Sequence, residues 1–163
     1  MISHHETRLV PYSAELMYAV VSDVEKYPQF LPWVVALRVL SRRENGLTAE
    51  MAVGYGALRE RYTSDVRLDP EARTIDVVEA HKAKGGGPFK TLENHWRFTP
   101  QKNPEEGDGC EVEFSITFEF NSRLLHGVAG KAFEKVLLKM TDAFEARAAA
   151  LSSIGSRAYN PPK

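Results

Sequence analysis

The polar residues best suited to chemistry lie in segments where apolar and polar side chains alternate. Glu60 and Ser64 flank Tyr62 at two-residue spacing, and Asn94 precedes Trp96 at the same spacing. Side chains two residues apart point to one face of a strand, so these polar groups are expected to face inward with the aromatic rings. A buried polar group without a partner is costly, so each one either pairs with another or faces a cavity that admits water or a ligand.

Acid–base catalysis is a second interpretation of such residues. Glu60, Glu79 and His81 carry side chains that take up and release protons. No spacing forces any two of them together, and a glutamate near the end of a strand is more often half exposed than catalytic. We therefore rank a cyclase-like enzyme last among the functions considered, and we predict a protein without catalytic residues.

Other reactive patterns are missing from the sequence. No G-x-S-x-G elbow occurs, no Cys/His/Asp/Glu set has the spacing of a metal site, and the glycine-rich run 85–87 lacks the Lys and Ser/Thr of a P-loop. Cys110 is the single cysteine, which excludes an internal disulfide and favours a small apolar packing role. We expect no metal and no cofactor.

Composition and charge narrow the class of protein. The 163 residues are 43% hydrophobic, which suits one soluble domain with a core. DNA is not an expected partner, because 21 Lys and Arg are balanced by 22 Asp and Glu. No apolar run approaches the roughly 20 residues that span a bilayer, so a cytoplasmic protein is expected. Lys131, Lys135 and Lys139 form a basic stripe that suits either solvent or anionic lipid.

The elements that position these residues follow from periodicity. Apolar residues recur every three or four positions over 121–152, which predicts a long helix capped by Asn121 or Ser122 and stopped near Gly155. Short helical segments are expected after Ser13 and in the proline-rich bend 23–34. Alternation of period two predicts strands at 2–10, 35–42, 47–55, 59–68, 74–80, 90–99 and 110–120.

This order of elements predicts an α+β fold. A curved antiparallel β-sheet of about seven strands would wrap around the long C-terminal helix, with two short helices after the first strand. We expect a single domain over residues 1–154 and a flexible C-terminal tail over 155–163.

Four stretches carry a resemblance to a known family. They are YSAELMYAVVSDVEKYPQFLPWV from Tyr12, RERYTS from Arg59, GPFKTLENHWRF from Gly87 and VEFSITFEFNSRLL from Val112. In this order they resemble the coenzyme Q-binding, polyketide cyclase-related family of the START (Bet v 1-like, helix-grip) superfamily. The same family includes the bacterial ribosome-association toxin.

The resemblance implies an apolar tunnel that holds ubiquinone or another polyisoprenoid as a bound ligand rather than a redox cofactor. The resemblance would place Phe30, Leu31, Pro32 and Trp33 near the mouth of the tunnel. The sheet side of the tunnel would be lined by Tyr62, Asn94, Trp96 and Phe118, and the helix side by Phe133, Met140 and Phe144. Glu60 and Ser64 would contact the polar head group. The small residues Gly127, Ala129, Gly130, Ala132 and Ala143 are expected to leave the gap that the ligand fills.

The implied function is a lipid chaperone. It would support respiratory electron transport or quinone biosynthesis at the inner-membrane surface, with the membrane enzymes as partners. The toxin-like alternative would bind the large ribosomal subunit instead. Both functions leave the protein non-catalytic.

Overall fold

The fold is a curved sheet with helices on its inner face. The computed structural model describes residues 2–56, 58–79, 88–102 and 107–158. Its elements are β1 (Ile2–Val10), α1 (Ala14–Ser22), η1 (Val24–Lys26), α2 (Tyr27–Phe30), β2 (Val34–Arg43), β3 (Gly46–Tyr55), β4 (Leu58–Asp69), β5 (Thr74–Glu79), β6 (Phe89–Gln101), β7 (Gly109–Phe120) and α3 (Arg123–Ala158).

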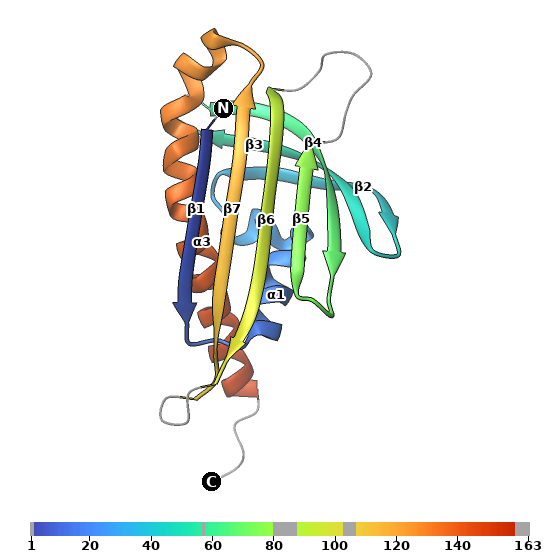
Figure 1. Ribbon diagram of the computed structural model, residues 1–163, viewed down its shortest axis with the longest axis vertical. Coiled ribbons are helices and arrows are strands. Elements are labelled where there is room, and N and C mark those ends of the chain that lie inside the picture. Colours follow the sequence, from blue (N-terminus) through green and yellow to red (C-terminus); the bar gives the residue numbers. More distant parts are fainter. Residues whose placement is uncertain (1, 57, 80–87, 103–106, 159–163) are drawn as a thin grey trace.

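All seven strands form one antiparallel sheet in the order β1-β7-β6-β5-β4-β3-β2. The sheet curves strongly: β1, β7 and β6 stand upright in Figure 1, whereas β3 and β2 cross behind them near α3. This is the predicted helix-grip arrangement. The strict alternation of burial along β7 also confirms the strand predicted there, because it depends only on local sequence. A two-residue turn, Glu44 and Asn45, joins β2 to β3, and Gly46 is the first residue of β3.

The segment between β1 and β2 is short and bent, as predicted. Ser13 caps α1 by accepting a hydrogen bond from the Leu16 backbone N–H at 3.1 Å. The next helix, α2, has only four residues with Pro28 at its start, and the chain then turns, with the Leu31 N–H bonded to the Tyr27 carbonyl at 2.8 Å. Trp33 and Val34 follow directly and are buried.

α3 begins where the sequence predicted and ends later. Ser122 accepts a hydrogen bond from the Leu125 N–H at 2.9 Å, so Ser122 is the residue that caps the helix. The predicted stop at Gly155 is wrong, because α3 continues to Ala158. A glycine ends a helix by adopting the left-handed conformation, but within a helix it costs only about 1 kcal/mol. Residues 159–163 of the predicted tail lie outside the described residues.

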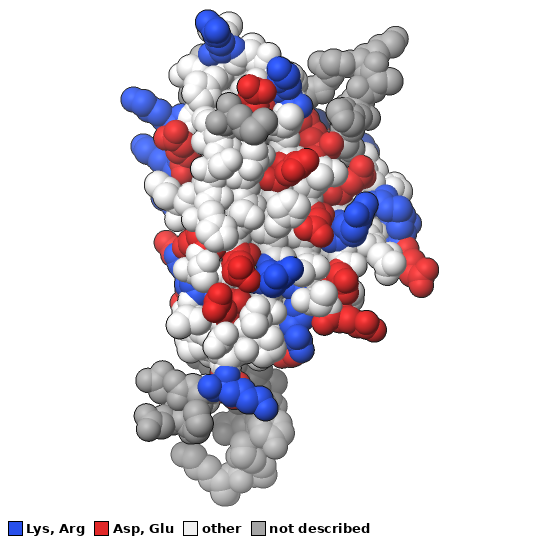
Figure 2. Space-filling model, in the orientation of Figure 1, with Lys and Arg blue, Asp and Glu red and all other residues white. Residues whose placement is uncertain are grey.

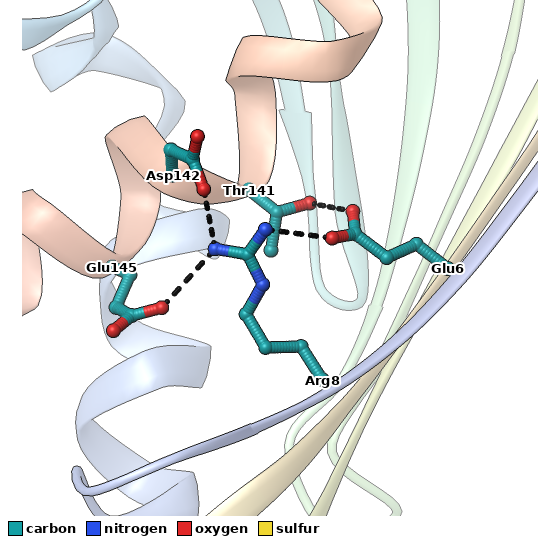
Figure 3. A network of polar contacts seen from close by, with 5 residues as sticks. All are labelled: Glu6, Arg8, Thr141, Asp142 and Glu145. Atoms are coloured by element: carbon teal, nitrogen blue, oxygen red, sulfur yellow. Dashed lines mark hydrogen bonds and ion pairs between the residues drawn. The ribbon is translucent and has the colours of Figure 1, made fainter.

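A polar network joins the edge strand β1 to α3 (Figure 3). Arg8 donates to Glu6 at 2.7 Å, to Asp142 at 2.6 Å and to Glu145 at 3.1 Å. Thr141 donates to the second oxygen of Glu6 at 2.7 Å. Burial lowers the pKa of Arg8, but the three carboxylates outweigh it and raise the pKa above its ordinary value. The guanidinium therefore stays charged and fixes α3 against the sheet edge.

The outer face of the sheet is polar. Figure 2 shows acidic and basic side chains interspersed over this face. Cross-strand pairs such as Arg61 with Glu50 at 3.3 Å and His95 with Asp76 belong to it. The two faces of the sheet thus separate a mixed-charge surface from an apolar interior.

Candidate functional site

A cavity of about 100 Å³ lies between the sheet and α3. α3 contributes Phe133, Val136, Met140 and Phe144, and the bend contributes Val24, Tyr27, Leu31 and Trp33. The sheet contributes Val34, Leu37, Ala49, Met51, Val53, Tyr62, Ser64, Val66, Ile75, Val77, Leu92, Asn94, Trp96 and Ile116. No acidic, basic or histidine side chain is among these described lining residues.

Most of the predicted ligand-binding residues meet at this cavity. The lining includes Leu31, Trp33, Tyr62, Ser64, Asn94, Trp96, Phe133, Met140 and Phe144. Their contact with a ligand remains a prediction. Four other predicted residues, Phe30, Pro32, Phe118 and Glu60, are not among the lining residues.

Phe30 and Pro32 lie outside the cavity because the bend points alternate side chains in opposite directions. Pro32 is exposed, whereas its neighbours Leu31 and Trp33 are buried. The Phe30 ring packs against Phe144, with the ring centroids 5.7 Å apart. Phe30 therefore contacts a residue of the cavity wall without lining the cavity itself.

Phe118 and Glu60 are displaced from the cavity for different reasons. Phe118 is 0% exposed because Phe133 covers it, with ring centroids 4.5 Å apart. Glu60 lies opposite Val53 near the start of β4 and is half-buried. The alternation correctly predicted that Phe118 faces inward, but it could not predict which inward residues α3 covers.

Of the two remaining acid–base candidates, only Glu79 lies within the described residues. Glu79 lies opposite Ser64 at the end of β5 and is half-buried. It is not among the lining residues, although it lies close enough to raise the pKa of Tyr62. His81 and the glycine-rich run 85–87 lie outside the described residues.

Aromatic rings that contact one another form part of the cavity wall. Phe144 meets Trp96 edge-on at 5.3 Å and Tyr27 at 5.3 Å, while Trp96 stacks on Phe114 at 4.3 Å. The Tyr27 hydroxyl donates to the Val21 carbonyl, and burial raises its pKa above the ordinary value. Tyr27 thus stays neutral and links the bend, α1 and α3 into one wall.

Three polar side chains break the apolar surface. Ser64 is buried among the lining residues, and the Asn94 Oδ1 is fully buried without a hydrogen-bond partner in the described part of the chain. The Tyr62 hydroxyl donates only weakly, to the sulfur of Met51 at 3.5 Å. Burial, and then the charge of Glu79, raises the pKa of Tyr62 to about 12. All three groups are neutral near pH 7 and suit a neutral ligand.

Some lining residues were missed at the sequence level. Tyr27, Met51 and Val136 line the cavity and were not among the predicted site residues. Their periodicity identified burial, but it does not distinguish contact with core from contact with a cavity. The small helix residues expected to leave the gap, including Gly127 and Gly130, do not line it.

The cavity is smaller than the roughly 300 to 1,000 Å³ of typical small-molecule sites. A ligand with an isoprenoid tail must therefore displace side chains. Met51 and Met140 line the cavity and are only half-buried. Methionine side chains are flexible and repack readily, so these two are the natural positions for widening.

Metal and thiol chemistry find no support among the described residues. No group of three or more His, Cys, Asp or Glu side chains within them could hold a metal ion. Cys110 is buried, and burial raises the pKa of its thiol to about 11. It is therefore protonated near pH 7 and packs as an apolar side chain.

Comparison with known proteins identifies the class first. Two solved structures share the fold. An aromatase/cyclase, Zhui from Streptomyces sp. R1128, superimposes with a TM-score of 0.77 over 91% of this chain and 93% of that one. A START superfamily protein from Mycobacterium smegmatis superimposes with a TM-score of 0.72 at 20% identity, over 91% of this chain and 98% of that one. At 15% and 20% identity these likenesses concern the fold alone. The family model described as polyketide cyclase / dehydrase and lipid transport matches residues 10–145. The chain therefore belongs to this family.

Two relatives are similar to this chain in sequence as well as in fold. The ribosome association toxin RatA of Escherichia coli K12 is 35% identical over 143 residues, covering 87% of this chain and 84% of the toxin. The coenzyme Q-binding protein COQ10 homolog B of Xenopus laevis is 34% identical over 151 residues, covering 90% of this chain. The chain spans 58% of the length of that COQ10 homolog. Among the described residues, no helix is long and apolar enough to cross a membrane.

Proposed function

We propose that this protein binds ubiquinone or a related polyisoprenoid in the cavity between the sheet and α3, without transforming it. The observation that carries the proposal is an almost entirely apolar lining interrupted by the Asn94 amide, whose Oδ1 has no partner within the described residues. The COQ10 homolog supports this ligand class. As a lipid chaperone, the protein would exchange its ligand with a membrane surface and serve respiratory or quinone-biosynthesis enzymes.

Physical magnitudes suit binding without a charged anchor. Burial of one CH₂ group contributes about 0.8 kcal/mol, so one isoprene unit contributes roughly 3 to 4 kcal/mol before the costs of ordering. A few units therefore reach useful affinity. Neutral lining groups then orient the head group without the desolvation cost of a buried ion.

The test is extraction followed by titration. Protein purified in mild detergent is extracted with organic solvent and analysed for polyprenyl quinones by mass spectrometry. Delipidated protein is then titrated with decylubiquinone, with the fluorescence of Trp33 and Trp96 in the cavity wall as the readout. Saturable quenching supports the proposal. Protein that yields no quinone and shows no saturable binding refutes it.

Ribosome association is a second candidate, favoured by the similarity to RatA over 87% of this chain. The exposed face of α3 offers Lys131, Lys135 and Lys139 to an anionic partner. Co-sedimentation with isolated large ribosomal subunits, at low and at moderate salt, tests it. Absence from the ribosomal pellet even at low salt would exclude this candidate and leave lipid binding unaffected.

The proposal of a non-catalytic protein rests on the same lining. Ser64, Asn94 and Tyr62 are neutral, and no general base is among the described residues that line the cavity. The aromatase/cyclase shares the fold, but at 15% sequence identity this likeness is no evidence for a shared reaction. Incubation with quinone or polyketide substrates should return them unchanged; a product that disappears in a Glu60→Gln or Glu79→Gln variant would show an enzyme.

A further inference from the structure

Among the described residues that line the cavity, Asn94 carries the one side-chain amide, and its surroundings are apolar. Asn94 pairs with Val77 on one side and with Ile116 on the other, and Leu92 and Trp96 flank it along β6. Its Oδ1 is sealed from solvent and accepts no hydrogen bond within the described structure. A buried acceptor without a donor destabilises the protein, so the site is incomplete as it stands.

The chemistry of the missing partner follows from the amide itself. A carboxamide presents an acceptor oxygen beside two N–H donors, and within the described residues the Asn94 oxygen has no donor. A hydroxyl group satisfies both sides, because it donates to the oxygen and accepts from the nitrogen. A carbonyl or an ether accepts only, and would leave Oδ1 unpaired.

We infer that the cavity selects lipids whose head group carries a hydroxyl group placed against the Asn94 amide. This inference rests on the proposed function and narrows it. Within the quinone class, the preferred ligand is the reduced quinol, whose two hydroxyl groups donate, rather than the quinone, whose oxygens only accept. Ser64, on the same cavity wall, supplies a second hydrogen-bonding position.

The test compares ligands that differ in the donor alone. Delipidated protein is titrated anaerobically by calorimetry with decylubiquinol, with its di-O-methyl ether and with decylubiquinone. Decylubiquinol is expected to bind about tenfold more tightly than either, because one buried acceptor gains a partner. Equal or tighter binding of the ether or of the quinone would overturn the inference.

A substitution then assigns the preference to Asn94. In Asn94→Leu the preference for the quinol over its ether should shrink to less than about twofold, since no acceptor remains to be satisfied. The steric effect of the methyl groups is common to both proteins and cancels in this comparison. The control Glu93→Leu changes the next residue, whose side chain is exposed on the outer face, and should keep the wild-type ratio. A ratio that persists in Asn94→Leu would exclude Asn94 as its source.

Failure of the proposed function is distinguishable from failure of this inference. If no quinone or quinol binds, the quinone proposal fails, and farnesol is compared with farnesyl methyl ether in the same assay. Tighter binding of farnesol, lost in Asn94→Leu, would keep hydroxyl selection with a different lipid. Equal binding of both, or binding of neither, would remove it.

Discussion

Thr141, in the middle of α3, donates a hydrogen bond to Glu6 on the edge strand β1 at 2.7 Å. Thr141 is 1% exposed, so this bond lies inside the helix–sheet interface. The other oxygen of Glu6 accepts from Arg8, which also binds two acidic residues of α3 (Figure 3). These hydrogen bonds fix the distance between α3 and the sheet, and therefore also the position of the cavity wall that α3 forms.

Removal of the central cation should loosen this attachment. Arg8→Met leaves three carboxylates close together, and we expect a loss of about 2 kcal/mol in the free energy of unfolding, reduced from the buried-pair value because Arg8 is partly exposed. Urea unfolding measures it. Arg38→Met is the matched control: Arg38 has a side chain that is 73% exposed and lies 3.6 Å from Glu50, so its loss should cost less than about 0.5 kcal/mol. Equal effects of the two substitutions would contradict the structural role of the network.

Occupation of the cavity by a side chain should compete with a ligand. Ala49 lines the cavity, so the ring of Ala49→Phe projects into its free volume, and the affinity for a quinone should fall at least about tenfold. Ala52→Phe is the control on the same strand, because Ala52 pairs with Arg61 and points to the other face. Both affinities come from tryptophan fluorescence titration, with thermal unfolding as the check of folding. Unchanged affinity in a folded Ala49→Phe variant would place the ligand elsewhere.

Tyr62 predicts a loss of stability at alkaline pH. Its pKa in the folded state is raised to about 12, whereas the unfolded value is about 10. Below about pH 10 Tyr62 is protonated in both the folded and the unfolded state, and its contribution to stability is fully present. As the pH rises from about 10 to about 12, the unfolded state ionises first, so the free energy of unfolding falls by roughly 2 to 3 kcal/mol. Urea unfolding at several pH values should show a shallower fall in Tyr62→Phe. An identical pH profile would mean that Tyr62 is accessible to water.

Two glycines should respond in opposite directions to the same substitution. A Cβ at Gly46 would lie 2.2 Å from the Val66 carbonyl oxygen, which is part of the sheet backbone and cannot move freely. Gly46→Ala should therefore destabilise the protein by about 2 kcal/mol or more. At Gly127, on the exposed side of α3, a Cβ meets no atom within 4 Å, so Gly127→Ala should stabilise the helix by roughly 0.5 to 1 kcal/mol. Thermal unfolding of both variants checks the signs; stabilisation by Gly46→Ala would refute the close approach of β3 and β4.

The sequence by itself determined the elements and the sides they bury. The alternation over 110–120 predicted the inward face of β7, and Ser13 and Ser122 predicted the starts of two helices, because these signals depend on neighbours a few residues away. The resemblance of four stretches added the helix-grip fold, which the family match over residues 10–145 supports. Nine of the site residues that the resemblance implied are among those that line the cavity.

The tertiary structure alone decided which inward residues reach free space. Phe118 and Asn94 both face inward on neighbouring strands, but Phe133 covers Phe118, whereas no side chain in the described ranges donates to the Asn94 Oδ1. That difference depends on where α3 crosses the sheet, which the contacts of Arg8 and Thr141 set across more than 130 residues of chain. Periodicity reports the face of an element. Only the packing of elements against one another decides whether that face meets a side chain or a cavity.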